Sequence, residues 1–96
     1  MLSVWKYHLD MVVEQVVEMP CFADLLDVQE QDGRLVMWAI VSTDMTAYAR
    51  VRVHLIGTGH PMPESLEKHA RARYLGTAQH TATGLVLHCF YEVLPP

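Results

Sequence analysis

The sequence predicts a mainly β fold, a small antiparallel β-sandwich or barrel of six to seven strands with at most one short helix. Apolar and polar residues alternate along residues 48–56, which is the period of a strand with one buried face. An Asp32-Gly33 pair separates two further β-like runs, as in a two-residue hairpin. Short strands with turn residues at close spacing are typical of sandwiches and barrels.

The first third of the chain contains three of the expected strands. Residues 4–9 alternate between apolar and polar positions, as in a half-buried strand. Residues 11–19 are rich in valine, which favours a second strand, although the spacing of the valines would also fit a helix. Pro20 ends that element because proline offers no N–H to a ladder. Residues 25–31 form the strand that leads into the Asp32-Gly33 turn.

The middle of the chain supplies two strands that differ in how their faces are covered. Residues 34–41 are apolar on both faces, so this strand is expected to be central or to lie under an interface. A mostly polar connection over residues 42–46 precedes residues 48–56, in which Val51 and Val53 face inward while Arg50 and Arg52 face outward.

The last third begins with a glycine and proline cluster and ends in two strands. The spacing of charged residues over 64–71 permits a two-turn helix opened by Pro63. Residues 73–80 form a weak strand in which Gly76 is a candidate bulge. A turn over residues 81–84 leads to residues 85–93, which are apolar on both faces and therefore predict another central strand.

Length and composition predict one domain over residues 1–96. Hydrophobic residues make up 51% and charged residues 19% of the chain, and this apolar excess favours a homo-oligomer. The net charge of −4 argues against sequence-independent binding of nucleic acid. The sequence has neither a long apolar run nor a secretion leader, so no membrane partner is indicated and a cytoplasmic location is expected. Cys21 and Cys89 are interpreted as small hydrophobic residues.

One loop is the first candidate for a binding site. It comprises Gly57, Thr58, Gly59, His60 and Pro61. The two glycines permit positive φ and a close approach of the backbone to an anionic ligand, and the histidine is placed to donate to it. The alternative interpretation is a tight turn in which the glycines and Pro61 serve only geometry. A phosphate-binding loop of the nucleotide-hydrolase type is excluded, because the required Lys followed by Ser or Thr is missing.

A second candidate surface combines aromatic and basic residues. Trp38 and Tyr48, with Arg50 and Arg52 on the outward face of the adjacent strand, are expected to form a stacking and cationic surface for a partner. The alternative is a packed aromatic residue beside two solvated arginines.

Metal and catalytic chemistry have weaker support in the sequence. Six histidines invite a metal hypothesis, but no spacing typical of a zinc site is present. His60, His88, Asp27 and Glu92 are the candidates for acid–base chemistry, and no pair has a diagnostic spacing. A nucleophile elbow is also missing. The sequence therefore indicates no metal, no cofactor and no enzyme.

Several short motifs follow one another along nearly the whole chain. They are Trp5-Lys6-Tyr7, Glu18-Met19-Pro20, Leu26-Asp27-Val28-Gln29, Met37-Trp38-Ala39, Gly57-Thr58-Gly59-His60-Pro61, Tyr74-Leu75-Gly76-Thr77 and Gly84-Leu85-Val86-Leu87-His88. Their order resembles a family of small uncharacterised proteins encoded in phage and prophage genomes, with Gly-Thr-Gly-His-Pro the most distinctive string. The chain departs from the family pattern at Cys21-Phe22, where a small turn-forming residue is expected after the proline.

The resemblance implies a phage or prophage gene and raises a counter-defence role. With the residues above, it predicts a non-catalytic accessory protein that holds a host protein or a small anionic ligand in the host cytoplasm. A structural virion or assembly protein is the alternative, and a small hydrolase is the third hypothesis.

Overall fold

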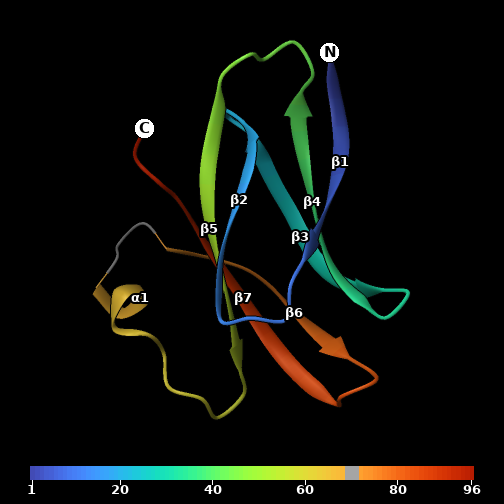
Figure 1. Cartoon of the computed structure of the whole chain (residues 1–96), viewed down its shortest axis with the longest axis vertical. Coiled ribbons are helices and arrows are strands. Elements are labelled where there is room, and N and C mark those ends of the chain that lie inside the picture. The colour runs from blue at the N-terminus through green and yellow to red at the C-terminus, as the bar shows by residue number, and fades with distance from the viewer. Residues whose placement is uncertain (69–71) are drawn as a thin grey trace.

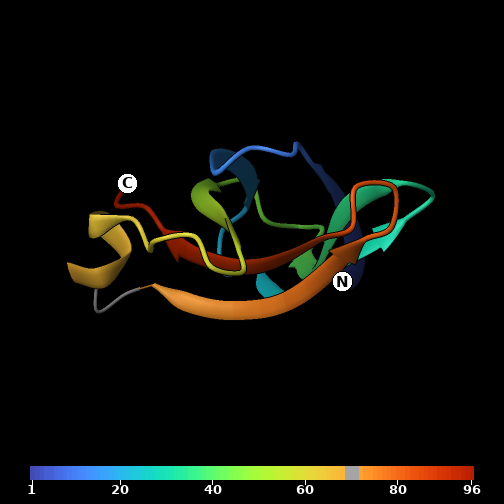
Figure 2. The same ribbon diagram turned by 90° about the horizontal axis from the view of Figure 1, so that it is seen from below.

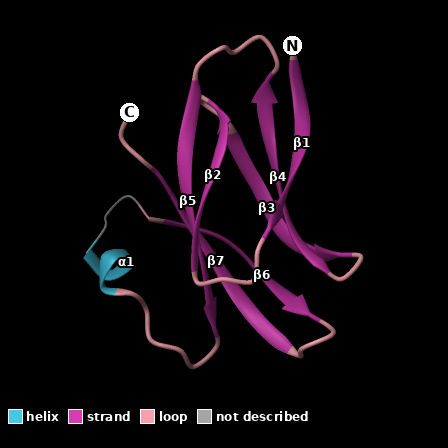
Figure 3. Cartoon of the chain, in the orientation of Figure 1, coloured by secondary structure: helices cyan, strands magenta, loops and turns pink. Residues whose placement is uncertain are grey.

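The chain folds as two antiparallel sheets packed face to face, with one short helix beside them (Figures 1 and 3). The computed structural model describes residues 1–68 and 72–96. One sheet has the order β1 (Leu2–Leu9), β4 (Arg34–Ser42), β3 (Asp24–Gln31). The other has the order β2 (Glu14–Pro20), β5 (Tyr48–Gly57), β7 (Leu85–Val93), β6 (Arg73–His80). The predicted mainly β sandwich is therefore confirmed.

The hairpin between β3 and β4 turns as its sequence predicts. Asp32 and Gly33 both have positive φ, at 51° and 81°. These are the values that a type I′ turn requires at its two central residues, and its twist matches that of the flanking strands. The turn places Gln31 opposite Arg34 and so sets the register of the whole hairpin.

The core lies between the two sheets and is built from the alternating apolar residues of their facing sides. Val51 and Val53 of β5 are at most 2% exposed, and Leu35 and Met37 of β4 are fully buried. The two strands predicted to be central from their apolar faces, β4 and β7, each lie between two neighbours. Residues 11–19 contain a strand, β2, and Pro20 is its last residue.

β3 and β6, at the edges of their sheets, lie beside each other, and both carry a bulge at the point of closest approach. The β3–β4 pairing shifts between Leu25 and Asp27, and the β6–β7 pairing shifts between Tyr74 and Gly76. A Cβ atom on Gly76 would lie 2.9 Å from Asp27 Oδ1 and 3.3 Å from Val28 Cγ1. The predicted bulge at Gly76 is confirmed, and its missing side chain lets the two strands approach.

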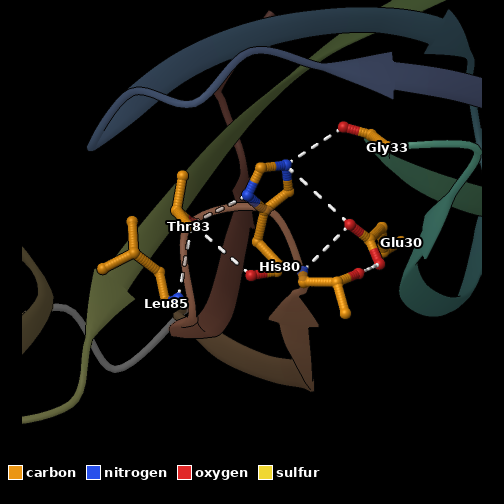
Figure 4. A network of polar contacts seen from close by, with 6 residues as sticks. Glu30, Gly33, His80, Thr83 and Leu85 are labelled. Atoms are coloured by element: carbon orange, nitrogen blue, oxygen red, sulfur yellow. Dashed lines mark hydrogen bonds and ion pairs between the residues drawn. The ribbon is translucent and has the colours of Figure 1, made fainter.

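A polar network holds the tips of the β3–β4 and β6–β7 hairpins together (Figure 4). His80 Nε2 donates to the carbonyl of Gly33 at 3.0 Å, and His80 Nδ1 is 2.8 Å from Thr83 Oγ1. The carboxylate of Glu30 accepts hydrogen bonds from both the backbone N–H and the hydroxyl of Thr81. These contacts fasten one sheet to the other along this edge.

The segment that leaves β5 turns back toward one side of the molecule. α1 (Glu64–Lys68) is shorter than the predicted helix over residues 64–71, whose last three residues lie outside the described ranges. Figure 2 shows α1 and the C-terminal end of the chain on the same side. Among the described residues, no helix is long and apolar enough to span a bilayer.

Candidate functional site

An apolar groove of about 660 Å³ opens where β2 ends and β5 begins. Its lining comes from the end of β2, the turn after it, the start of β3, the start of β5 and the C-terminal segment after β7. The lining residues are Glu18, Met19, Pro20, Cys21, Phe22, Ala23, Leu25, Tyr48, Ala49, Arg50, Val51, Val93, Leu94, Pro95 and Pro96. Ligand pockets in proteins typically enclose about 300–1,000 Å³ and are mostly apolar, so the groove has the size and the character of a binding site.

Backbone hydrogen bonds fix the walls of the groove. The N–H of Cys21 donates to the carbonyl of Ala47 at 2.9 Å, which ties the β2–β3 turn to the start of β5. The N–H of Leu94 donates to the carbonyl of Arg50 at 2.9 Å, which continues the β5–β7 ladder into the C-terminal segment. Both walls are therefore anchored by backbone hydrogen bonds to β5, one of the two central strands of its sheet, or to the residue just before it.

Phe22, at the tip of the β2–β3 turn, has the most unusual conformation among the lining residues. The N–H of Ala23 donates to the carbonyl of Pro20 at 3.3 Å and closes a four-residue turn in which Phe22 has φ 65°. A turn of this kind favours glycine or asparagine at that position, because a Cβ atom crowds the backbone at positive φ. The Phe22 side chain is nevertheless 92% exposed. A large aromatic ring thus stands in solvent, beside an apolar groove, on a strained backbone.

Two residues of the predicted aromatic and basic surface line the groove. Tyr48 is 55% exposed, and Arg50 is exposed beside it. Glu18 lies opposite Arg50 in the β2–β5 register, so the polar side of the groove carries one charge of each sign. Tyr48 also lies close enough to Tyr7 to act on it: burial raises the pKa of Tyr7, and the neighbouring Tyr48 adds to that rise.

Arg52 lies on the same outer face of the four-stranded sheet but does not line the groove, because it pairs with Glu92. Its Nη1 donates to Oε1 of Glu92 at 3.1 Å, and Glu92 is only 3% exposed. His54, two residues along β5, is completely buried although its position in the alternation points away from the inter-sheet core. The guanidinium of Arg52 therefore serves a largely buried ion pair.

The prediction that Trp38 shares a surface with Tyr48, Arg50 and Arg52 is wrong. Trp38 is on β4, which belongs to the other sheet, and its side chain faces away from the core because Met37 and Ala39 face inward. It lies opposite Lys6 of β1 and Asp27 of β3. Alternation predicted the outward direction of Tyr48, Arg50 and Arg52, but the assumption that the strand of Trp38 lies beside β5 was incorrect.

The Gly57 to Pro61 loop forms a tight turn. The N–H of His60 donates to the carbonyl of Gly57 at 3.0 Å, and Gly59 has φ 86° as the turn requires. Thr58 Oγ1 is 2.8 Å from His88 Nε2, while the backbone N–H of Thr58 donates to Val86. The ring of His60 lies over Gly57, where a Cβ atom would come within 3.0 Å of Nδ1. His60 and Pro61 are exposed and do not line the groove.

Two other side chains that could take part in acid–base or nucleophilic chemistry are hydrogen-bonded within the fold or buried. His88 lies between Thr58 and Thr77, with Nδ1 3.0 Å from Thr77 Oγ1, so both of its ring nitrogens have hydroxyl partners. Burial raises the pKa of the Cys89 thiol to about 12, which keeps it protonated and unreactive near neutral pH. Among residues 1–68 and 72–96, no three His, Cys, Asp or Glu side chains converge to hold a metal ion.

Sequence reasoning missed most of the groove because its walls come from three separate stretches of the sequence, residues 18–25, 48–51 and 93–96. Met19, Leu94, Pro95 and Pro96 carry no local pattern that brings them together. Phe22 did carry a signal: a large aromatic residue occupies a turn position after Pro20, where a small residue is expected.

Comparison with known proteins gives the chain a family. No curated protein matches the chain significantly. No solved structure matches it either. A family described as a domain of unknown function (DUF7352) matches residues 1–95, and the chain therefore belongs to that family.

Proposed function

We propose that this domain is a non-catalytic binding module that holds an apolar segment of a partner protein in the groove between β2, β5 and the C-terminal segment. The observation that carries the proposal is the exposed ring of Phe22, held at positive φ on the rim of an apolar groove of about 660 Å³. Strained residues that persist in a fold are enriched at ligand-binding sites. Exposed aromatic residues are also common anchors in protein interfaces.

The lining residues indicate the chemistry of the bound segment. The floor is aliphatic and includes Met19, Leu25 and Leu94, so it favours an aliphatic or aromatic side chain of the partner. Tyr48 and Phe22 provide two ring faces on the rim. Arg50 provides a cationic group beside them, which favours an acidic residue next to the apolar anchor.

The absence of catalysis is also part of the proposal. It is supported by the engagement of both His88 ring nitrogens with threonine hydroxyls and by the protonated state of the buried Cys89 thiol. The two histidine nitrogens have no general-base role while they hold Thr58 and Thr77 in place.

The biological setting rests on the resemblance to phage and prophage proteins. In that setting the partner is a host protein in the host cytoplasm and the role is counter-defence. A small anionic ligand is the other occupant that the sequence suggested for this protein, and Arg50 is the group in the groove that would receive it. A small anion would need Arg50 but not the aliphatic floor, whereas an apolar segment needs both.

The test is a selection of linear peptides from a random display library on the intact chain, after which the affinity of each enriched peptide is measured on wild type and on a Phe22→Asn variant. We expect enriched peptides to share one large apolar residue with a nearby acidic residue. Their affinity should fall at least ten-fold on Arg50→Gln, a loss of about 1.4 kcal/mol that is ordinary for one charged contact in an interface. Enriched peptides that bind wild type and Phe22→Asn equally would overturn the assignment of the groove.

A structural role in virion assembly is the second candidate. It is favoured by a separate observation: of the fifteen large hydrophobic side chains that are exposed among the described residues, eight lie within the first sixteen residues. They are Met1, Leu2, Val4, Trp5, Met11, Val12, Val13 and Val16. Such a concentration of apolar surface is typical of contacts between protein chains. Copurification of the chain with intact particles, rather than with a host protein, would favour this candidate over the first.

A further inference from the structure

We propose that two copies of this chain pair through their β1 strands, antiparallel and around a two-fold axis that places Trp5 of one copy opposite Trp5 of the other. This pairing joins the two three-stranded sheets into one continuous sheet of six strands. The proposal concerns β1 alone and does not depend on the use of the groove.

β1 is the least protected of the four edge strands. β3 and β6 face each other, and each is interrupted by a bulge. β2 ends in Pro20 and carries Glu14 and Glu18, so pairing two β2 strands around Val16 would oppose like charges. β1 is a regular strand of eight residues without proline, it pairs with β4 on one side only, and its N-terminal part lies at the margin of the molecule in Figure 1.

Alternate residues of β1 direct their backbone groups toward β4 or toward the free edge, and one hydrogen bond shows which residues do which. The N–H of Thr43 donates to the carbonyl of Met1, which marks Met1 and Thr43 as a hydrogen-bonded pair of the β1–β4 ladder. Such pairs alternate along an antiparallel ladder, so the odd-numbered residues of β1 bond to β4. The even-numbered residues Leu2, Val4, Lys6 and His8 therefore direct their N–H and C=O groups away from the sheet.

This alternation and the length of the strand together select one register for β1 against β1 of the second copy. Even-numbered residues must pair with even-numbered residues of the second copy to form hydrogen bonds, and full overlap of the strand then pairs Leu2 with His8 and Val4 with Lys6. About eight backbone hydrogen bonds result, two for each such pair. Trp5 faces Trp5 across the axis as a non-hydrogen-bonded pair, the arrangement in which facing side chains come closest.

The side chains of β1 are compatible with this partner. Leu2 is 70% exposed, Val4 56% and Trp5 36%, so pairing removes apolar surface from water. Lys6 is the only lysine or arginine in the paired stretch, and its Nζ donates to Gln31 Oε1 at 2.7 Å. In the proposed register Lys6 lies opposite Val4 of the second copy, so the two lysines of a dimer do not face each other.

The first test is the solution mass of the intact chain by analytical ultracentrifugation over a range of concentrations. We expect a monomer–dimer equilibrium, and a chain that stays monomeric at every concentration overturns the proposal. The matched variants Val4→Glu and Val4→Lys remove the same methyl groups and add opposite charges opposite Lys6 of the second copy. Each dimer contains two such contacts between position 4 and Lys6. We therefore expect the dissociation constant of the Val4→Lys dimer to exceed that of the Val4→Glu dimer by about ten-fold. Equal dimerisation of the two variants contradicts the register.

The second test is a disulfide that only this axis allows. Residues opposite each other in a non-hydrogen-bonded pair have Cα atoms about 4.5 Å apart, within the range that a disulfide spans. Trp5→Cys should therefore form a covalent dimer under mild oxidation, whereas Val4→Cys, whose side chain lies off the axis, should cross-link far more slowly. Circular dichroism of each variant confirms the fold, and preferential cross-linking of Val4→Cys would overturn the proposed axis.

Discussion

Replacing Phe22 by asparagine should raise stability and abolish binding at the same time. Most residues with a Cβ atom lose about 1–2 kcal/mol in the left-handed region, whereas asparagine adopts it more readily because its short polar side chain hydrogen-bonds locally. Because the Phe22 side chain is 92% exposed, its removal returns little apolar surface to water. The net gain should be about 1 kcal/mol, which corresponds to a rise in Tm of about 4–8 °C for a domain of this size.

Thermal unfolding and urea unfolding, followed by circular dichroism, measure the stability half of this prediction. Titration with a peptide selected on the wild-type chain measures the binding half. Phe22→Leu is the control, because leucine keeps both the strained backbone and an apolar side chain and should not stabilise the fold. A Phe22→Asn variant that is less stable than wild type would show that the ring supports the turn, and unchanged peptide affinity would remove Phe22 from the site.

Three further substitutions test a buried hydroxyl group and two contacts between the sheets. Tyr7→Phe should stabilise the domain by about 1 kcal/mol in urea unfolding, because the buried hydroxyl of Tyr7 has no hydrogen-bond partner among the described residues; a loss of stability would show that the hydroxyl is bonded. Gly76→Ala should lower Tm, because the new Cβ atom would meet Asp27 at 2.9 Å, and an unchanged Tm would contradict that close approach. The hydrogen bonds from Thr81 lower the pKa of Glu30, so its carboxylate stabilises the fold above the ordinary carboxyl pKa, and this stability is lost as pH falls through the lowered value. Glu30→Gln should therefore be less stable than wild type near neutral pH and indistinguishable from it in acid, and a difference that persists in acid would refute the linkage.

The strands were predictable because each depends on a local pattern. Alternation located β5, and the Asp32-Gly33 pair located the β3–β4 turn, since a type I′ turn needs residues that accept positive φ. Gly76 signalled a bulge for a different reason, because a glycine inside a strand marks a place where another backbone or side chain comes close.

The partners of each strand were not predictable from these patterns. β4 and β5 are consecutive in the sequence but belong to different sheets, so Trp38 and Arg50 lie on opposite outer faces. A polar connection of a few residues is equally compatible with a hairpin and with a crossing between sheets, and the choice is made by the packing of the two sheets against each other. His54 is buried and Arg52 pairs with Glu92 of the neighbouring strand β7, although positions 52 and 54 alternate as outward residues. These contacts lie on the outer face of the four-stranded sheet and were not predictable from alternation along β5 alone.

The groove could not be predicted from patterns of neighbouring residues, because the residues that form it are separated by up to 78 positions, from Glu18 to Pro96. The earlier candidate, the Gly57 to Pro61 loop, has a structural explanation for each feature that singled it out. Gly59 supplies the positive φ of the turn, Thr58 contacts His88, and His60 covers Gly57. Whether Gly57, Thr58, Gly59, His60 or Pro61 also contacts a partner stays a prediction.

The most direct test of the groove is an amide chemical-shift map of the intact ¹⁵N-labelled chain titrated with 1-anilinonaphthalene-8-sulfonate, an aromatic anion that resembles an apolar anchor beside an acidic group. The account predicts shifts concentrated at residues 21–23, at Tyr48 and Arg50, and at Leu94, and their loss in Phe22→Asn. Shifts confined to residues 57–61, or a saturable site elsewhere that Phe22→Asn leaves unchanged, would contradict it.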